Sequence, residues 1–259
     1  MTQKQLSAPL TGGNENTGLL KVIAILCMIA DHIGAKFFPT IVELRVIGRI
    51  AFPLFAWCLC VGAVHTRNVW KYALRVLLVG ILSQPFYMQA LDHKWYQLNV
   101  FATLLLGLLA IAGIRKKRWG SHIWAPALAL ACSVVIQMDY GWQGVLFILL
   151  LYACRGKPST IAALMISYCL YWGYGTFQVN SFLGVNLAEV LTRLTGNSRL
   201  GSDMARVQFY AILALPLMLI PMKGRLRLPK WISYGAYPAH LLVLGVIRHW
   251  NNIMFLFHR

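Results

Sequence analysis

Residues 21–34 read KVIAILCMIADHIG, an apolar segment with a lysine at one end and an Asp-His pair near the other. Extended to residues 19–38, the segment has the roughly 20 mostly apolar residues needed to cross about 30 Å of hydrocarbon. An ionisable residue inside such a span is costly and marks a candidate functional site. The segment therefore indicates a membrane helix and also the first place to look for chemistry.

Similar apolar windows fill the rest of the chain. We predict that nine windows cross the membrane: residues 19–38, 46–64, 70–89, 98–114, 122–138, 142–154, 161–177, 205–222 and 231–250. They show no internal repeat and leave no room for a separate soluble domain. The expected fold is an all-α polytopic membrane protein with about nine transmembrane helices, in a range of about eight to ten. Residues 19–259 are expected to form one membrane domain, preceded by a polar N-terminal tail at residues 1–18.

The composition favours a membrane protein over a nucleic-acid binder. Of 259 residues, 59% are hydrophobic and 12% are charged, whereas soluble domains carry about 25% charged residues. The net charge of +17 comes from 24 lysines and arginines against seven acids. These basic residues form short clusters between apolar runs, not one basic face on a polar domain, so no nucleic-acid partner is expected.

The basic clusters follow the positive-inside rule if the N-terminus is cytoplasmic and the C-terminus is outside. Fifteen of the 24 basic residues then lie at inner loops or helix ends: Lys4, Lys21, Arg67, Lys71, Arg75, Arg115, Lys116, Lys117, Arg118, Arg155, Lys157, Lys223, Arg225, Arg227 and Lys230. The first window has no small-residue cleavage site, so we expect it to be retained in the mature protein. The six cysteines lie inside the windows without zinc-ligand spacing, which predicts reduced core residues and no metal site.

Lys21 and His32 are eleven positions apart and therefore share one stripe of a helix, about 16 Å apart along its axis. A cation at the cytoplasmic end suits phosphate, and a neutral imidazole deeper in the membrane suits a general base or a nucleophile. The alternative is that Lys21 anchors the helix at the membrane surface and His32 is a hydrogen-bonded packing residue.

Four more ionisable residues, Asp31, Arg45, Arg49 and His240, are candidates for the same site. Arg45 and Arg49 lie one turn apart on the face of the next helix. Because an unpaired arginine there is costly, we expect Asp31 to pair with Arg49, either as a structural clamp or as part of a catalytic site. His240, two residues after the helix-kinking Pro238, is a second candidate imidazole or a packing residue.

A polar cluster is expected at the inner membrane surface, where a phosphate-bearing ligand would arrive. It comprises His65, Thr66, Arg67, Asn68, Lys71 and Arg75. Membrane anchoring explains the lysine and arginines, but the His-Thr-Arg-Asn run also suits capture of a phosphate or diphosphate. The chain lacks a Walker phosphate loop, a GxSxG elbow and an HExxH motif, which argues against ATP-driven transport, a serine lipase and a zinc protease.

With these residues the sequence resembles the TraX family of integral membrane acetyltransferases, in which acetylation of a pilin amino terminus is known. The matching stretches are residues 21–34, residues 44–55, the segment from Gly62 through His65 to Asn68 with Tyr72 and Arg75, and residues 237–241. The Lys-x10-His spacing also resembles the Arg/Lys-x10-His motif of a wider superfamily of transmembrane acyltransferases. The resemblance places the protein in the bacterial cytoplasmic (inner) membrane.

The resemblance implies an acetyltransferase that uses cytoplasmic acetyl-CoA as co-substrate and no metal. It implies that His32 is the catalytic imidazole and Lys21 its motif partner, and that Arg67 and Arg75 correspond to cytoplasmic arginines of the superfamily. The acceptor is expected at the outer side of the membrane, with a pilin or other peptide N-terminus favoured and a sugar or small molecule open. The resemblance leaves open whether the acceptor is acetylated on nitrogen or oxygen, and whether transfer is direct or passes through an acetyl-histidine intermediate. It also leaves open whether the protein is a homo-oligomer.

In the mechanism that follows, the CoA phosphates bind the inner cluster and the thioester reaches His32 between the helices. Asp31 orients the site, and Arg45 and Arg49 hold the acceptor or polarise the thioester carbonyl, with His240 beside them. One alternative is a proton-coupled secondary transporter with Asp31, His32 and His240 as a relay. That class predicts inverted repeats, which the sequence lacks. The other alternative is a structural scaffold, which would tolerate apolar residues in place of Asp31 and His32.

Overall fold

The structure is a computed structural model that describes residues 11–179, 181–222, 226 and 228–257. Within these residues the chain is helical apart from its turns and one antiparallel pair of two-residue strands. The elements run in the order α1 (Thr17–Lys36), α2 (Val42–Gly48), α3 (Ala51–His65), α4 (Val69–Leu91), α5 (Val100–Lys116), η1 (Arg118–Gly120), α6 (Ser121–Val135), α7 (Gly141–Cys154), α8 (Pro158–Gly173), β1 (Ser181–Phe182), β2 (Val185–Asn186), α9 (Leu187–Thr195), α10 (Ser198–Met204), η2 (Val207–Ala214), α11 (Leu215–Leu219) and α12 (Lys230–Phe257). The predicted all-α class is confirmed.

The predicted windows coincide with helices to within a few residues. The second window holds two helices, α2 and α3, and the eighth holds η2 followed by α11. By length and composition, three helical segments among the described residues can cross a membrane: Thr17–Lys36, Val42–His65 and Val69–Leu91. The protein is thus a helical membrane protein, while the count of nine crossings and the N-in orientation stay predictions.

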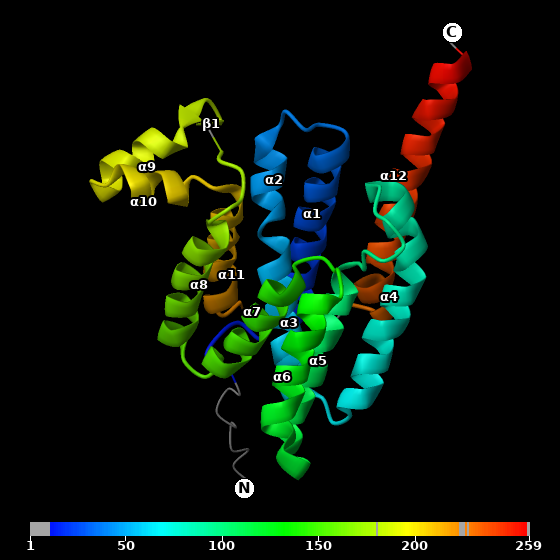
Figure 1. The fold of residues 1–259 in the computed structure, drawn as a ribbon, viewed down its shortest axis with the longest axis vertical. Helices are drawn as coiled ribbons and strands as arrows, with labels where there is room; N and C mark the ends of the chain where they lie inside the picture. The colour runs from blue at the N-terminus through cyan, green and yellow to red at the C-terminus, as the bar shows by residue number, and fades with distance from the viewer. Residues whose placement is uncertain (1–10, 180, 223–225, 227, 258–259) are drawn as a thin grey trace, which may run out of the picture.

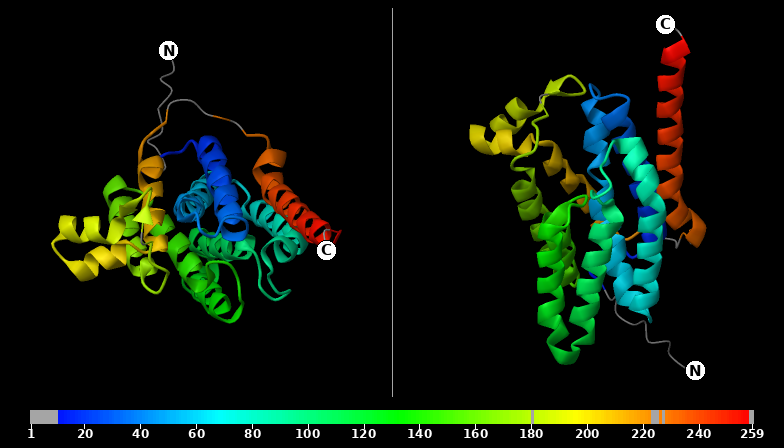
Figure 2. Two further views of the ribbon diagram at one scale, coloured as in Figure 1. Left: turned by 90° about the horizontal axis from the view of Figure 1, so that it is seen from above. Right: turned by 45° about the vertical axis from the view of Figure 1, so that its right-hand side comes forward.

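The long helices lie side by side and alternate in direction. The turns between α3 and α4, α5 and α6, and α7 and α8 lie toward the end of the molecule where the described chain begins, and the C-terminal end of α12 projects at the opposite end (Figures 1 and 2). These turns carry basic residues that we assigned to the cytoplasmic side. Lys4, Lys223, Arg225 and Arg227 lie outside the described residues, as does the side chain of Lys230.

Helix α3 forms the centre of the core. Eleven of its 15 residues are buried, and Trp57 is fully buried against its neighbours. The indole N–H of Trp57 donates a 2.8 Å hydrogen bond to the carbonyl of Asn14. Asn14 in turn donates from its backbone N–H to the Met218 carbonyl at 2.6 Å and from its side chain to the Leu217 carbonyl at 3.0 Å. Residues 11–16, part of the predicted polar N-terminal tail, therefore pack against the domain.

A proline explains why the second window is broken. Pro53 has no backbone N–H to donate to the carbonyl of Arg49, and its ring crowds that carbonyl. The helix accordingly ends at Gly48 and restarts at Ala51. The junction places Arg49 between two helices in the interior of the domain, and the dihedral angles of Arg49 and Ile50 stay in the right-handed helical region.

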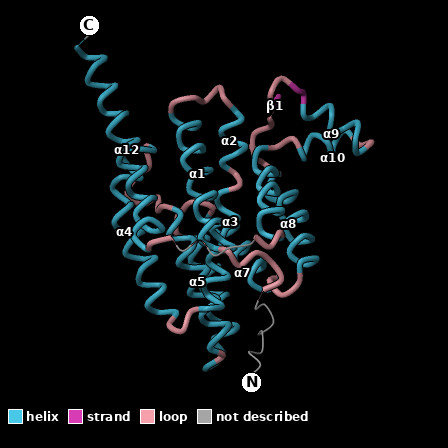
Figure 3. The backbone as a smooth tube through the Cα atoms, turned by 180° about the vertical axis from the view of Figure 1, so that it is seen from behind, coloured by secondary structure: helices cyan, strands magenta, loops and turns pink. Residues whose placement is uncertain are grey.

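Helix α12 lies along α4 and continues past it (Figure 3). Asp92, at the end of α4, forms an ion pair with Arg248 of α12, with 2.5 Å between Nη1 and Oδ1, and accepts a hydrogen bond of 3.1 Å from Lys36 of α1. The bond from Arg248 is the main reason that the pKa of Asp92 is lowered, and Lys36 adds to it. The carboxylate is thus ionised at neutral pH and ties three helices together on the side away from the basic turns.

Candidate active site

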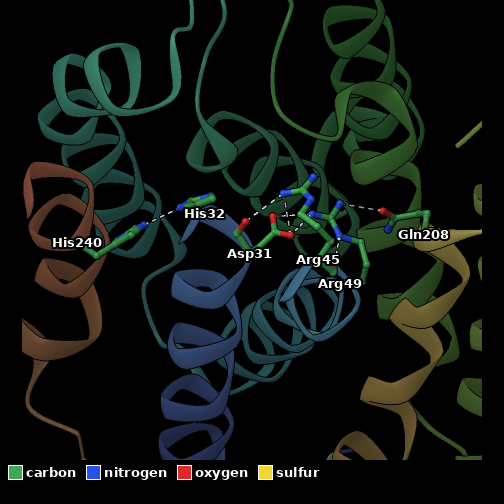
Figure 4. A network of polar contacts seen from close by, with 6 residues as sticks. All are labelled: Asp31, His32, Arg45, Arg49, Gln208 and His240. Carbon is green, nitrogen blue, oxygen red and sulfur yellow. Dashed lines mark hydrogen bonds and ion pairs between the residues drawn. The ribbon is translucent and has the colours of Figure 1, made fainter. Parts of the chain in front are cut away.

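Asp31 and His32 project to opposite sides of α1 (Figure 4). On one side, Nη2 of Arg49 donates to both carboxylate oxygens of Asp31, at 2.5 Å each. Nη1 of Arg45 lies 3.0 Å from the same carboxylate and 3.2 Å from the Asp31 backbone carbonyl. The predicted contact between Asp31 and Arg49 is present, and Arg45 joins it.

The clamp of Asp31, Arg45 and Arg49 carries an excess positive charge. Two guanidinium groups share one carboxylate, and the other contacts of Arg49 are with uncharged oxygens, the Arg45 carbonyl at 3.3 Å and Oε1 of Gln208 at 3.2 Å. The side chains of Asp31 and Arg49 are each only 12% exposed, so water screens this charge weakly. The site can therefore stabilise negative charge that develops on a bound ligand.

Gly48 permits the close approach of α1 and α2 that forms the clamp. A Cβ atom added to Gly48 would lie 2.3 Å from both Cβ and Oδ1 of Asp31. Real Cβ atoms essentially never come that close to another heavy atom. Only glycine at this position leaves room for the Asp31 side chain between the two helices.

We expect Gly48→Ala to displace Asp31 and to lower the free energy of unfolding by about 1–3 kcal/mol, the usual effect of an overpacked core. The measurement is thermal unfolding of the purified protein in detergent. Gly235→Ala is the matched control, because a Cβ there meets nothing within 4 Å. Equal melting temperatures for the two variants would contradict the role given to Gly48.

On the other side of α1, His32 contacts His240 of α12 (Figure 4). Nδ1 of His32 lies 2.8 Å from Nε2 of His240, although the two residues are 208 positions apart in the chain. Nδ1 of His240 lies 3.0 Å from the carbonyl of Ala236. The helix that begins at residue 230 thus brings the second candidate imidazole directly to the first.

These contacts determine the tautomers of a neutral pair. The Ala236 carbonyl can only accept, so Nδ1 of His240 carries a hydrogen and its Nε2 is the acceptor. Nδ1 of His32 must then donate to Nε2 of His240, which leaves the lone pair of His32 on Nε2. His240 consequently orients His32 with an unprotonated ring nitrogen, the arrangement that a general base or a nucleophile needs.

A cavity of about 500 Å³ lies between the histidine pair and the arginine clamp. The polar and aromatic residues that line it are Asp31, His32, Lys36, Arg45, Arg49, Phe52, Phe55, Tyr87, His93, Asp139, Tyr140, Gln208 and Tyr237. Asp139 accepts a 2.6 Å hydrogen bond from the hydroxyl of Tyr87. In the sequence, Asp139 is only a weak signal at the outer side, and the tyrosines, Gln208 and His93 are missed because they have no distinctive spacing.

A second, narrow cavity of about 60 Å³ leads away from the first along α1. The two cavities share the lining residues Met28, Phe55, Val100 and Tyr237. The narrow cavity has mostly apolar walls and also contacts Lys21 at the start of α1. Lys21 and His32, the two ends of the Lys-x10-His stripe, therefore line two cavities that share part of their walls.

The family of this chain follows from comparison with known sequences. The family described as TraX protein matches residues 16–248, which include both histidines and both arginines of the site. The chain belongs to the TraX family. It is similar to the protein TraX of Escherichia coli, with 23% identity over 88% of this chain and 86% of that protein. It is also similar to the probable fimbrial assembly protein FimC, serogroup H1, of Dichelobacter nodosus, with 33% identity over 56% of this chain.

The chain spans 66% of the length of the Dichelobacter nodosus relative. No solved structure matches it. The geometry of the candidate site is therefore described from this structure alone.

In this TraX-family chain the predicted inner cluster lies at the turn between α3 and α4, and much of it stabilises that turn. The side chain of Asn68 caps α4 by accepting from the backbone N–H of Lys71 at 3.0 Å. Nδ1 of His65 lies 2.9 Å from the Val61 carbonyl, and the Thr66 hydroxyl donates to the Asn68 carbonyl at 3.3 Å. These side chains are only partly available for a ligand.

The inner cluster does not converge on one cavity. Arg67 and Asn68 line a third cavity, of about 880 Å³, beside α5 and α6. On the other side, Tyr72 lines the narrow cavity, and the guanidinium of Arg75 lies 5.7 Å from the Tyr72 ring centre. Sequence reasoning missed Ser233 and Tyr234, which line the narrow cavity near Lys21.

The six cysteines are free thiols. Among the described residues, no group of three or more His, Cys, Asp or Glu side chains is placed to hold a metal ion.

Proposed function

We propose that this TraX-family protein is an acetyltransferase that moves an acetyl group from cytoplasmic acetyl-CoA to an acceptor amine or hydroxyl at the outer side of the membrane. The observation that carries the proposal is the position of His32: its Nε2 is left free by the contact with His240, and it lies at the cavity that also holds the excess positive charge. A base and an electrostatic stabiliser on one cavity are the parts that acyl transfer needs.

The narrow cavity supports a path for the acetyl donor. Acetyl-CoA has a charged nucleotide end and a slender pantetheine arm that ends in the thioester. In the proposed complex Lys21 binds a CoA phosphate, and the arm lies between the apolar walls formed by Met28 and Phe55. The thioester then reaches the larger cavity beside His32.

The proposed reaction balances without a metal or a redox partner. Nε2 of His32 accepts a proton from the acceptor as the acceptor nitrogen or oxygen attacks the thioester carbonyl carbon. The negative charge on the carbonyl oxygen is stabilised by Arg45 and Arg49, whose positions Asp31 holds. The carbon–sulfur bond then breaks, the proton passes from His32 to the departing thiolate, and the products are the acetylated acceptor and CoA.

The names of the relatives favour one class of acceptor. One relative is described as a probable fimbrial assembly protein. We therefore propose that the acceptor is the N-terminus of a pilin or another peptide, delivered to the cavity from the outer side.

The hydrogen bond between His32 and His240 also suits a proton relay, which is the basis of the transporter alternative. The two functions differ in their ligands. An acetyltransferase binds CoA and acetyl-CoA, whereas a proton-coupled transporter has no reason to bind either.

We expect CoA and acetyl-CoA to raise the melting temperature of the purified protein. At a concentration of about 100 times Kd the ligand adds about 2.7 kcal/mol of stability, which for a chain of this size is a rise of about 5–10 °C. Lys21→Met should weaken CoA binding about tenfold through the loss of a charge-assisted contact. Lys157→Met, which removes an exposed cation that lines neither cavity, should bind CoA normally. A wild-type protein that is indifferent to millimolar CoA would favour the transporter instead.

A further inference from the structure

A further large cavity lies outside the candidate active site. It has a volume of about 880 Å³ and is lined by residues from the start of α4 and from α5 and α6. The start of α4 and the α5–α6 turn lie at the end of the molecule that carries the basic turns (Figure 1). Its volume is in the range of specific ligand sites. None of the steps proposed for acetyl transfer uses it. We refer to it as the α5–α6 groove.

The α5–α6 groove is apolar along its length and aromatic near its basic end. Leu128 on α6 is 56% exposed and lies on its wall. Trp70, Trp119 and Trp124 also line it and are 62%, 85% and 53% exposed. Exposed tryptophans of membrane proteins concentrate at the level of the lipid headgroups, whereas exposed leucines face the acyl chains. The groove thus has the apolar walls and the aromatic rim that fit a lipid molecule.

The aromatic end of the α5–α6 groove is strongly basic. Arg67, Arg115, Lys116 and Arg118 line it, and no Asp or Glu is among the described residues of its wall. Arg115 is occupied, because it donates to the carbonyls of Ala63 and Thr66. By contrast, the side chains of Arg67, Lys116 and Arg118 make no hydrogen bond or ion pair with any described residue. Their charges are therefore available to a ligand.

We propose that the α5–α6 groove binds an anionic phospholipid of the cytoplasmic leaflet, with the phosphate at Arg67, Lys116 and Arg118 and the acyl chains along α5 and α6. Charge complementarity favours this ligand, because three unpaired cations face a groove with no Asp or Glu among the described residues of its wall. The apolar surface beside them suits the acyl chains of a lipid. Basic pockets between helices at the cytoplasmic surface are typical sites for anionic headgroups. The inference rests on the proposed membrane orientation and is independent of acetyl transfer.

Native mass spectrometry of the full chain in detergent tests this assignment, with phosphatidylglycerol and phosphatidylcholine of identical acyl chains as probes. Each basic residue near an anionic membrane surface contributes about 1 kcal/mol, so Lys116→Gln should weaken phosphatidylglycerol binding about fivefold. Lys116→Gln together with Arg118→Gln should weaken it roughly twenty-five-fold. Phosphatidylcholine binding should be weaker than phosphatidylglycerol binding in the wild-type protein and unchanged in the variants.

Lys157→Gln is the matched control, because Lys157 is an exposed cation at the same end of the molecule that does not line the groove. It should leave both affinities within about twofold of the wild-type values. Because Lys116 and Arg118 have no side-chain partner among the described residues, their variants are expected to keep the wild-type melting temperature, which separates lost binding from lost folding.

Three results would overturn the proposal. Equal affinity for the two lipids would make the groove an ordinary lipid-facing surface. Displacement of bound phosphatidylglycerol by inorganic phosphate alone would assign the cations to a free anion. Displacement by CoA would assign the groove to the acetyl donor. Because none of these measurements uses acetyl transfer, failure here leaves the proposed enzymatic function to be judged by its own tests.

Discussion

His32→Ala is expected to lower acetyl transfer about a thousandfold, because a positioned general base contributes about 10²–10⁴ to a reaction rate. The variant frees Nε2 of His240, but His240 does not line the cavity and is therefore not placed to take over. The measurement is mass spectrometry of extracts from cells with and without the protein, which detects the acetylated product whichever molecule is the acceptor. Full product formation by the variant would exclude His32 as the base.

Two further variants separate a catalytic role from a structural one. His122→Ala removes an exposed histidine at the start of α6 and should leave activity unchanged. His240→Leu should lower the maximal rate about tenfold to a hundredfold without changing the concentration of acetyl-CoA needed for half-maximal rate, because His240 orients His32 and does not bind the donor. His240→Gln, whose amide oxygen can still accept from His32, should recover part of that loss. Equal losses in the Leu and Gln variants would count against the orienting hydrogen bond.

Breaking the arginine clamp from the carboxylate side is expected to destabilise the protein strongly. Asp31→Leu leaves Arg49 buried without a counter-charge, and removal of one partner of a buried ion pair typically costs about 3–5 kcal/mol. For a chain of this length the melting temperature should fall by about 10 °C or more. The measurement is thermal unfolding in detergent, followed by both circular dichroism and tryptophan fluorescence.

The double variant Asp31→Leu with Arg49→Met tests the cause of that loss. Replacing a buried ion pair by packed apolar groups is often neutral, so the double variant should regain most of the stability. Arg45 loses its partner too, but its side chain is 24% exposed and can be hydrated. The control is Arg193→Met, which breaks the pair of Arg193 and Glu189 at 78% and 55% exposure and should cost less than about 1 kcal/mol. A double variant as unstable as the sum of its single variants would contradict charge pairing as the role of the clamp.

The parts of the fold that sequence predicts well are those set by local pattern. The helix positions follow from apolar length, and the alignment of Lys21 and His32 on one face follows from 3.6 residues per turn. The pairing of Asp31 with Arg49 could be predicted because a buried arginine needs a counter-charge and only one carboxylate was near. These inferences do not depend on how distant helices pack.

Other features depend on tertiary packing and could not be predicted. The contact between His32 and His240 joins positions far apart in the chain, and nothing in either local sequence specifies it. Asn14 is polar but buried against α11, because its side-chain amide and its backbone N–H both donate to carbonyls of that helix. Its polar character alone could not predict this burial. Of the inner cluster, Arg67 and Asn68 line one cavity, whereas the nearby Tyr72 lines a different one, a separation that depends on how α4 packs.

The most direct test of the proposed function uses inside-out membrane vesicles from cells that carry the chain and its natural acceptor. Acetyl-CoA labelled in the acetyl group is added outside the vesicles, at their cytoplasmic face, and covalently bound label inside the vesicles is measured. The proposed mechanism predicts that label accumulates inside vesicles with the wild-type chain and not in those with His32→Ala. Equal labelling in both preparations, or none in either when the acceptor is present, would contradict transfer of the acetyl group across the membrane through His32.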